Sequence, residues 1–456
     1  MVSKLAKNLI GSEIIKIGNQ VNELKAQGAE IANLTIGDLD SKIYPIPAEL
    51  KQNIQKAYQN DLTNYPPANG LLSLRKSVSK DLKSRWNLEY SPDDILVAGG
   101  SRPLIYATFK TIVDEGDKVI YAVPSWNNNH YSYLTSAKAV EIEVTPENNF
   151  LPTATDLTPH LDGAVLVALC SPLNPTGTMF TKEQLSEICE AIIAENKKRK
   201  EGEKPLYLMY DQIYAMLTFG DSEHFNPVTL FPEMKDYTIY IDGTSKCFAA
   251  TGVRVGWGFG PTKVMDKMKA LLTHVGAWAP KPEQQAVAEF LENTEAVDTF
   301  VNDYKGKIAH SLEVLHAGIQ EMKAKNFAVD SIKPMGALYL TIKLDYVGNT
   351  TEDGKVLKDS TDLVFYLIEK AGVALVPFSA FGNSREMPWF RASVGACSVE
   401  DLQKMFPKLE TALSKLKYTK FAQSARDKFI LDCLKHLLIS GTFFVNLLPN
   451  KRPLTL

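Results

Sequence analysis

The sequence predicts a doubly wound α/β protein with a mostly parallel sheet, followed by a smaller α+β region. Several short runs are continuously apolar, which is typical of strands buried on both faces of a parallel sheet. Amphipathic stretches with helical spacing separate these runs, and this alternation indicates helices on both faces of the sheet. The expected strands are residues 94–100, 118–124, 163–170, 205–211 and 237–243.

A helix and a short strand are expected before this sheet. Residues 12–27 have helical periodicity that ends at Gly28, and "IANLTIG" (31–37) then has the composition of a strand. Within the sheet region, residues 102–116 and 181–198 are clear amphipathic helices between strands. The chain is thus expected to pass through a separate N-terminal segment before it enters the sheet.

The pattern changes after about residue 290. One long helical pattern covers residues 282–325, and the expected strands 336–344, 373–382 and 389–396 follow it. We expect four parts: an N-terminal segment that joins the small domain (1–45), a large domain (46–300), a small domain (301–420) and a C-terminal extension whose role the sequence does not indicate (421–456).

The composition is that of an ordinary globular protein and argues against nucleic-acid and membrane partners. Apolar residues make up 45% and charged residues 23%, and the formal charge of −3 provides no basic surface for nucleic acid or an anionic membrane. Acidic residues interrupt the one dense lysine run (195–204), which favours a solvated helix end. The apolar run at 436–448 is too short to span a bilayer and contains Gly441.

The cysteines and histidines predict a reducing environment and no metal site. The five cysteines are odd in number and far apart, which favours a cytoplasmic location. The seven histidines are scattered without metal-ligand spacing. The N-terminus has no continuous apolar stretch, so we expect no secretory signal.

Polar and aromatic residues follow the expected strands where each strand ends. Taken singly, a glycine pair makes a tight turn, an aspartate caps a helix, a tryptophan fills a core and a lysine faces solvent. Ligands of open α/β sheets, however, bind at the carboxyl ends of the strands, so these residues should meet at one edge. They are Gly100 with Ser101, Trp126, Asn174, Asp211 with Tyr214, and Ser245 with Lys246.

Together these residues offer what pyridoxal 5′-phosphate requires. Its phosphate needs backbone N–H groups, hydroxyls and an arginine, and its ring needs an aromatic plate, a carboxylate for the ring nitrogen and donors for the ring oxygen. Its aldehyde needs an amine, whose pKa should be lowered by partial burial and a neighbouring arginine. The candidates for the phosphate are Gly100, Ser101, Ser245 and Arg254. Trp126 is the candidate for the ring face, Asp211 for the ring nitrogen, Asn174 with Tyr214 for the ring oxygen, and Lys246 for the aldehyde.

Four longer motifs contain most of these residues. The most specific is "SKCFAATGVRVGW" (245–257), and "SPLNPTG" (171–177), "YDQIY" (210–214) and "NYPPANGLLSLR" (64–75) accompany it in order and spacing. By these motifs the sequence resembles the class I, aspartate aminotransferase-like, aminotransferases of the fold-type-I pyridoxal-phosphate family. The resemblance covers about residues 10–417.

The resemblance implies a role for each matching residue at the cofactor. Lys246 would form a Schiff base with pyridoxal 5′-phosphate and then move a proton between the substrate Cα and the cofactor C4′. Asp211 would hold the charge of the ring nitrogen, and Trp126 would stack on the ring. The remaining cofactor contacts would be Asn174 and Tyr214 at the ring oxygen O3′, and Gly100, Ser101, Ser245 and Arg254 at the phosphate.

The resemblance also implies substrate and subunit contacts. Arg391, within the apolar "WFRASVGA", would bind the substrate α-carboxylate in a bidentate manner, because an arginine in an apolar strand needs such a partner. Gly37 and Asn174 would lie next to that carboxylate. Tyr65 would reach the phosphate of the other subunit, which implies a homodimer with shared active sites.

Three departures from the family pattern leave the substrate open. "GDLDSKIYP" (37–45) lacks a proline that is common there, Phe378 stands where glycine is common, and Trp278 precedes a Lys-Pro pair in a segment usually rich in small residues. We expect all three on the substrate side of the site. Arg102 is a candidate partner for a side-chain carboxylate, although its place beside the phosphate turn also suits a purely local charge.

The expected activity is amino-group transfer between an L-amino acid and a 2-oxo acid, with aspartate-, aromatic- and alanine-type substrates all open. A C–S lyase or another β-eliminating lyase would use the same residues, because fold and cofactor do not fix the reaction. A nucleotide-binding regulatory protein is the alternative from another class. It rests on "GWGFGP" (256–261), which lacks the G-x-G-x-x-G spacing of a dinucleotide-binding loop.

Overall fold

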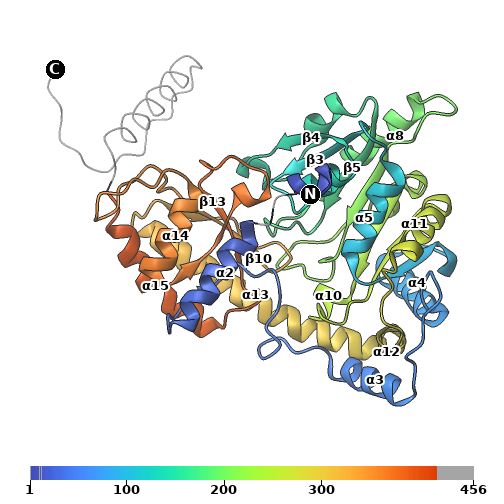
Figure 1. The fold of residues 1–456 in the computed structure, drawn as a ribbon, viewed down its shortest axis with the longest axis horizontal. Coiled ribbons are helices and arrows are strands. Elements are labelled where there is room, and N and C mark those ends of the chain that lie inside the picture. Colours follow the sequence, from blue (N-terminus) through green and yellow to red (C-terminus); the bar gives the residue numbers. More distant parts are fainter. Residues whose placement is uncertain (1, 10, 12, 418–456) are drawn as a thin grey trace.

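A seven-stranded sheet forms the centre of the larger lobe in the computed structural model, which describes residues 2–9, 11 and 13–417 (Figure 1). The strand order is β2-β8-β7-β6-β5-β3-β4, and every neighbouring pair is parallel except the two pairs that β8 makes. The predicted α/β fold with a mostly parallel sheet is therefore confirmed. The strands are β2 (Ile95–Ala98), β3 (Lys118–Val123), β4 (Lys138–Glu143), β5 (Ala164–Cys170), β6 (Tyr207–Asp211), β7 (Thr238–Gly243) and β8 (Gly256–Phe259).

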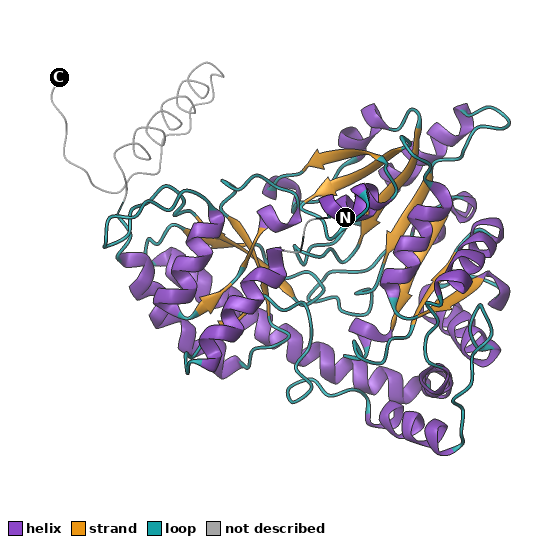
Figure 2. Cartoon of the chain, viewed as in Figure 1, coloured by secondary structure: helices purple, strands orange, loops and turns teal. Residues whose placement is uncertain are grey.

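Alternate residues of these strands face two separate layers of helices. Ile95 and Val97 of β2 share a core with α4, α8 and α12, whereas Leu96 and Ala98 share a core with α5 and α11. Both faces are thus covered by helices, as Figure 2 shows. The helices of this lobe are α3 (Ala48–Gln59), α4 (Leu72–Trp86), α5 (Ser101–Ile112), α6 (Asn128–Leu134), α7 (Ala154–Leu157), α8 (Lys182–Lys198), α9 (Pro227–Leu230), α10 (Thr244–Cys247), α11 (Thr262–Val275) and α12 (Lys281–Glu292).

Two strands of this sheet, β4 and β8, were not predicted. β4 is an edge strand in which only Ile142 is buried, so it lacks the apolar run of a central strand. β8 contains the first part of "GWGFGP" and pairs antiparallel with β2 and β7, so this segment is not a strand-to-helix turn for a dinucleotide. Gly256 needs to be glycine, because a Cβ there would lie 2.5 Å from the carbonyl carbon of Gly100.

The smaller lobe is built on an antiparallel four-stranded sheet in the order β12-β13-β10-β9. Helices α13, α14 and α15 share its core, as do Ile17 and Val21 of the N-terminal helix α2. The strand predicted at 31–37 is shorter than expected, since only Ala32 and Asn33 pair with β11. The bounds are α1 (Lys4–Asn8), α2 (Glu13–Ala26), β1 (Ala32–Asn33), α13 (Thr294–Ala324), β9 (Val329–Ser331), β10 (Tyr339–Leu344), α14 (Ser360–Ala371), β11 (Val373–Ala374), β12 (Val376–Pro377), β13 (Trp389–Ser393) and α15 (Val399–Ser414).

The long helical pattern at 282–325 forms two helices, so the prediction of one was wrong. Asn293 breaks the pattern with non-helical φ and ψ of −93° and 76°. Its side-chain oxygen accepts a hydrogen bond from the N–H of Ala296 (3.2 Å) and so caps α13. A capping asparagine leaves the apolar spacing almost unchanged on either side, which is why the break is hidden in the sequence.

Helix α13 passes from the larger lobe to the smaller one (Figure 1). Val297 and Val301 lie in the core of the larger lobe, whereas Tyr304 and Ile308 lie in the core of the smaller lobe. On this observation we propose a domain boundary near residue 300. Of the N-terminal segment (1–45), α2 packs in the small domain, whereas α1 contacts the larger lobe, where the Tyr133 hydroxyl donates to the carbonyl oxygen of Leu5 (2.9 Å). The predicted extension at 421–456, with Cys433 and the apolar run 436–448, lies outside the described residues.

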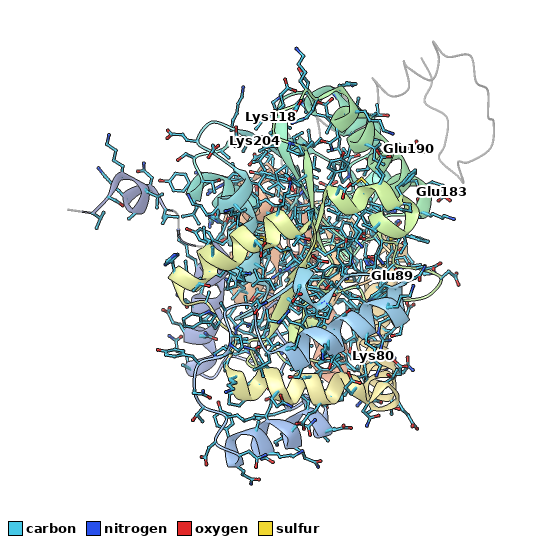
Figure 3. All side chains as sticks on the ribbon, turned by 90° about the vertical axis from the view of Figure 1, so that its right-hand side faces the viewer. Lys80, Glu89, Lys118, Glu183, Glu190 and Lys204 are labelled. Atoms are coloured by element: carbon cyan, nitrogen blue, oxygen red, sulfur yellow. The ribbon has the colours of Figure 1, made fainter. Side chains whose placement is uncertain are left out.

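Charged side chains lie on the outside of the larger lobe, where many of them pair (Figure 3). Lys80 binds Glu292 with an N–O distance of 2.5 Å, and Lys204, at the end of the lysine run, binds Asp114 at 2.6 Å. Exposed pairs of this kind add little to stability, so the apolar cores hold the fold together. Within the described part of the chain, no helix is long and apolar enough to cross a membrane, and no three potential metal ligands come together.

Gly256→Ala should lower the free energy of unfolding by roughly 1–3 kcal/mol, because the added methyl group overlaps the backbone of Gly100. Gly306→Ala is the matched control: Gly306 is exposed in α13 and has no atom within 4 Å of its Cβ position. That change should stabilise the protein by about 0.5–1 kcal/mol. Urea unfolding measures both variants, and equal effects would contradict the close approach of β8 to Gly100.

Candidate active site

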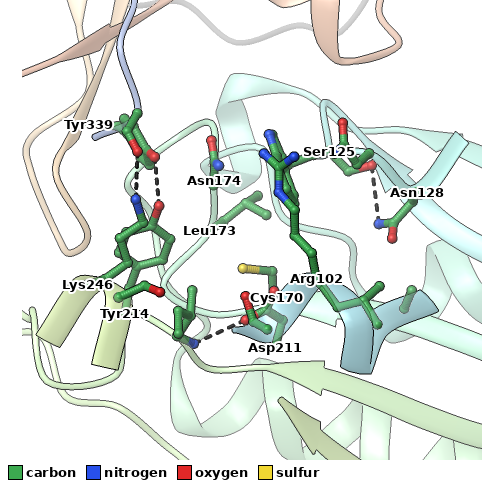
Figure 4. Close-up of a pocket in the computed structure, with 18 of the residues that line it drawn as sticks. Arg102, Ser125, Asn128, Cys170, Leu173, Asn174, Asp211, Tyr214, Lys246 and Tyr339 are labelled. Atoms are coloured by element: carbon green, nitrogen blue, oxygen red, sulfur yellow. Dashed lines mark hydrogen bonds between the residues drawn. The ribbon is translucent and has the colours of Figure 1, made fainter. Parts of the chain in front are cut away.

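A cavity of about 710 Å³ lies between the two lobes, at the carboxyl ends of the parallel strands (Figure 4). Every residue predicted for the site lines it, apart from Gly100 and Tyr65. Segments far apart in the sequence therefore meet here. This was predicted, because polar residues follow the expected strands and the ends of those strands should lie together. The lining residues from the predicted set are Gly37, Ser101, Trp126, Asn174, Asp211, Tyr214, Ser245, Lys246, Arg254 and Arg391.

One end of the cavity is suited to an anion. Helix α5 begins at Ser101, so the free N–H groups and the partial positive charge of its first turn lie at this end. Arg254 donates hydrogen bonds to the carbonyl oxygens of Gly99 (2.9 Å) and Thr251 (2.7 Å). Gly100 has a φ of +95°, and a Cβ there would lie 2.1 Å from Nη2 of Arg254. Gly100 therefore permits the guanidinium to lie against the helix start, where a phosphate would meet both.

Asp211 stands at the end of β6 and is a half-buried carboxylate with one backbone partner. Its Oδ1 accepts a hydrogen bond from the N–H of Ile213 (3.1 Å). Burial raises the pKa of Asp211 to about 6, although this hydrogen bond opposes the rise. A carboxylate in such a place is stabilised by a cationic N–H donor that enters the cavity, which a protonated pyridine nitrogen provides.

Lys246 lies in α10, directly after β7, and its amine faces the same cavity. Nζ donates a hydrogen bond to the carbonyl oxygen of Gly37 (2.6 Å). Burial lowers the pKa of Lys246 to about 8; Asp38 opposes this change, whereas the nearby arginines add to it. An appreciable fraction of the amine is therefore neutral near pH 8, as a nucleophile toward an aldehyde must be.

Arg391 brings a buried guanidinium to the other end of the cavity. The residue is 2% exposed, and burial lowers its pKa. Nη1 donates to Oδ1 of Asn174 (3.0 Å) and Nη2 donates to the carbonyl oxygen of Thr35 (2.6 Å). No carboxylate in the described part of the chain forms an ion pair with it, so Arg391 is suited to bind the carboxylate of a ligand.

Tyr339 is a residue of the cavity that the sequence did not single out. Its hydroxyl lies 2.6 Å from the hydroxyl of Tyr214, and the Arg391 guanidinium lies 4.7 Å from the centre of its ring. In the ladder between β10 and β13, Tyr339 pairs with Ser393, two residues from Arg391, so Tyr339 and Arg391 share a face. The sequence signal was only a polar-tipped residue in the apolar run "GALYLTIKL" (336–344).

Trp126 and Arg102 form a second polar wall. The guanidinium carbon of Arg102 lies 4.5 Å from the centre of the Trp126 ring, a cation–π contact. Both residues line the cavity, and Figure 4 shows Arg102 reaching into it. In the described part of the chain Arg102 forms no ion pair, so its charge is available to a ligand.

Tyr65 lies outside this cavity. Its side chain is 81% exposed, and its ring lies 5.3 Å from that of Trp278. A residue so exposed contributes nothing to the site of its own chain, and its contact with a partner subunit stays a prediction.

The expectation that all three departures lie on the substrate side was wrong for Phe378, and for Trp278 it stays a prediction. Phe378 is fully buried and packs on Phe150 with ring centres 5.1 Å apart, so it fills a core. Trp278 lies against Tyr65 and near the backbone of Gly99, outside the cavity lining. Only the "GDL" segment reaches the cavity, through Gly37 and Asp38. Each position was assigned from the sequence spacing, which does not show the direction in which a side chain points.

The sequence matches a family model and several known aminotransferases. The model of the family "Aminotransferase class I and II" matches residues 29–409. The aspartate aminotransferase of Bacillus sp. (strain YM-2) is 28% identical over 384 residues, which cover 84% of this chain and 92% of that protein. The probable aspartate/prephenate aminotransferase of Rickettsia felis is 29% identical over 420 residues, 90% of this chain and 96% of that protein.

Solved structures agree with the sequence matches. The aspartate aminotransferase of Rhizobium meliloti superimposes with a TM-score of 0.83 at 25% identity and covers 91% of this chain and 100% of that one. The aspartate aminotransferase of Thermus thermophilus with maleate gives 0.80 at 25% identity and covers 90% of this chain and 99% of that one. The fold is therefore the fold-type-I fold that the resemblance implied.

In the cofactor-free protein, Asp211→Asn should raise the free energy of unfolding at pH 8 by about 1–3 kcal/mol. Because burial raises the pKa of Asp211 to about 6, the folded state favours the protonated carboxyl. The wild type therefore loses stability as the pH rises through that pKa, and the amide does not. Urea unfolding at several pH values measures the difference, which should vanish below about pH 4. A difference that does not depend on pH would contradict burial as its cause.

Proposed function

The chain belongs to the class I and II aminotransferases and is a transferase that moves amino groups, and we propose that it does so with pyridoxal 5′-phosphate bound at Lys246. The observation that carries this proposal is the convergence, in one cavity, of a half-buried amine, a half-buried carboxylate, a helix start suited to an anion and an arginine without an ion-pair partner among the described residues. Neither the β-eliminating lyase nor the nucleotide-binding regulator is favoured by the family match.

The residues present fit this cofactor at both ends. The α5 start with Gly100 and Ser101, together with Ser245 and Arg254, would hold the phosphate, and Asp211 at the opposite side would hold the ring nitrogen. Asn174 and Tyr214 would donate hydrogen bonds to the ring oxygen, and Trp126 would cover the ring face. When bound, pyridoxal 5′-phosphate supplies an electron sink that acidifies the Cα–H of an amino acid.

Lys246 would act both as the attachment point and as the base. As a free amine, Lys246 would take the proton from the substrate Cα and return it at C4′. A pKa of about 8 suits this task, because a proton carrier is most effective near the operating pH. The hydrogen bond from Nζ to the Gly37 carbonyl (2.6 Å) shows an acceptor that keeps the freed amine in the cavity.

Two arginines would select a dicarboxylic substrate of the aspartate type. Arg391 would bind the α-carboxylate, with Gly37 and Asn174 beside it. Arg102 would bind the side-chain carboxylate, since it lines the cavity without an ion-pair partner in the described residues. The names of the relatives, aspartate and aspartate/prephenate aminotransferases, support this choice.

We further propose a homodimer with shared active sites in the cytoplasm. The exposed Tyr65, whose ring packs edge to face on that of Trp278, would reach the phosphate in the partner's site. The four cysteines of the described chain are all free, which supports a reducing compartment.

The purified protein should show a visible absorption band that aspartate bleaches and a 2-oxo acid restores. Lys246→Ala should abolish the band, because no other amine of the predicted set faces the ring site. Absorption spectra with one amino acid added at a time measure this directly. A band that persists while pyruvate and ammonia accumulate would identify a lyase instead, and no band after addition of pyridoxal 5′-phosphate would refute the cofactor.

Arg102→Gln should lower kcat/KM for aspartate roughly tenfold or more, because a hydrogen bond between charged groups is lost. The value for alanine, which has no side-chain carboxylate, should stay within about a factor of two. Arg385→Gln is the control, since Arg385 is an exposed arginine that pairs with Asp359 away from the cavity. Equal losses for both amino acids would show that Arg102 sets local charge only.

A further inference from the structure

A hydrogen bond between two tyrosines joins the lobes inside the cavity. Tyr214 follows β6 of the larger lobe, and Tyr339 begins β10 of the smaller lobe. Their hydroxyl oxygens are 2.6 Å apart, and the two residues are 2% and 1% exposed. Figure 4 shows the pair beside Lys246. Two buried phenols at this distance share one hydrogen bond, whose direction the free protein leaves open.

The position of Tyr339 is fixed on several sides. Its ring meets that of Tyr214 edge to face at 5.7 Å, and the Arg391 guanidinium lies over it at 4.7 Å. On the third side is Gly37, where a Cβ would lie 2.9 Å from the Tyr339 hydroxyl. The hydroxyl is therefore held toward Tyr214 by its surroundings.

A count of protons fixes the direction of the hydrogen bond once the ring is present. A phenol has one proton to donate. If Tyr214 donates that proton to the ring oxygen, it has none for Tyr339 and can only accept. Tyr339 must then be the donor, and the positive charge of Arg391 over its ring makes its hydroxyl a stronger donor. Hydrogen bonds in such a chain reinforce one another, so Tyr214 becomes a better donor to the ring oxygen.

We propose that Tyr339 is a positioning residue of the aminotransferase reaction: it donates to Tyr214, and through Tyr214 it stabilises negative charge on the cofactor's ring oxygen. This inference rests on the proposed function, because it assigns Tyr214 to that oxygen. The ring oxygen competes for the proton of the nitrogen that joins Lys246 to the cofactor. With less support from Tyr214, the oxygen attracts this proton more strongly, and the nitrogen retains it to higher pH.

The test follows the pH at which the visible band of the holoenzyme changes. Tyr339→Phe should move this midpoint upward by about 0.3 to 1 pH unit, the loss expected for one neutral hydrogen bond. In the Tyr214→Phe background, the additional change Tyr339→Phe should produce no further shift, because Tyr339 acts only through Tyr214. Tyr366→Phe is the matched control: it removes a buried tyrosine hydrogen bond to the carbonyl oxygen of Ala412 (2.8 Å) in the same lobe, outside the cavity, and should leave the midpoint unchanged.

A second variant keeps the test decisive if Tyr339→Phe does not fold. Fluorotyrosine incorporated at position 339 keeps the shape and makes the hydroxyl a stronger donor, so the midpoint should move downward. An unchanged midpoint in both variants, or the same shift with and without the Tyr214 hydroxyl, would overturn the inference while the proposed function stands. A wild type without a visible band would instead refute the proposed function, and the inference with it.

Discussion

The buried guanidinium of Arg391 is the interaction on which the arrangement of the cavity depends. It donates hydrogen bonds to Asn174 in the larger lobe and to Thr35 in the N-terminal segment, and it lies over the ring of Tyr339 in its own lobe. Removing such a charge from water is costly unless acceptors surround it, so the three segments are held together around it. The same need for acceptors makes the site attractive to a carboxylate.

Three charged groups around the cavity form no ion pair with an oppositely charged side chain in the described part of the chain. Burial raises the pKa of Asp211 to about 6 and lowers that of Lys246 to about 8, so each group is brought closer to its neutral form. Arg254 adds positive charge at the anion end without an acidic partner in the described chain. A ligand with a phosphate at one end, a basic ring nitrogen and an aldehyde, such as the proposed pyridoxal 5′-phosphate, would pair with all three of these groups at once.

Features that depend on the order of residues along the chain could be predicted from the sequence. Features that depend on how distant segments pack could not. Lys246 and Asp211 could be placed because Asp211 ends one strand and Lys246 comes shortly after another, and the carboxyl ends of parallel strands meet at one edge of a sheet. Strand β8 was missed because its alternating glycines, of which Gly256 permits the approach to Gly100, remove the apolar run that marks a strand. Tyr339 could not be recognised, since its role arises from the pairing of β10 with β13 and from contact between the lobes. Phe378 was assigned to the substrate side in error, because spacing along the chain does not reveal that it turns toward Phe150.

Arg391 can accept a substrate without releasing the contacts that hold the lobes together. A guanidinium has five N–H donors, and the protein uses one on each of Nη1 and Nη2. Each terminal nitrogen keeps one further N–H, which gives a pair of donors, whereas Nε is buried and has no hydrogen-bond partner in the described part of the chain. That pair is the fork that a carboxylate binds in a bidentate manner. The absence of a side chain at Gly37, whose Cβ would lie 3.5 Å from Nη1, keeps the approach open. Arg391 could therefore bind a substrate carboxylate while it keeps the hydrogen bonds that join the lobes.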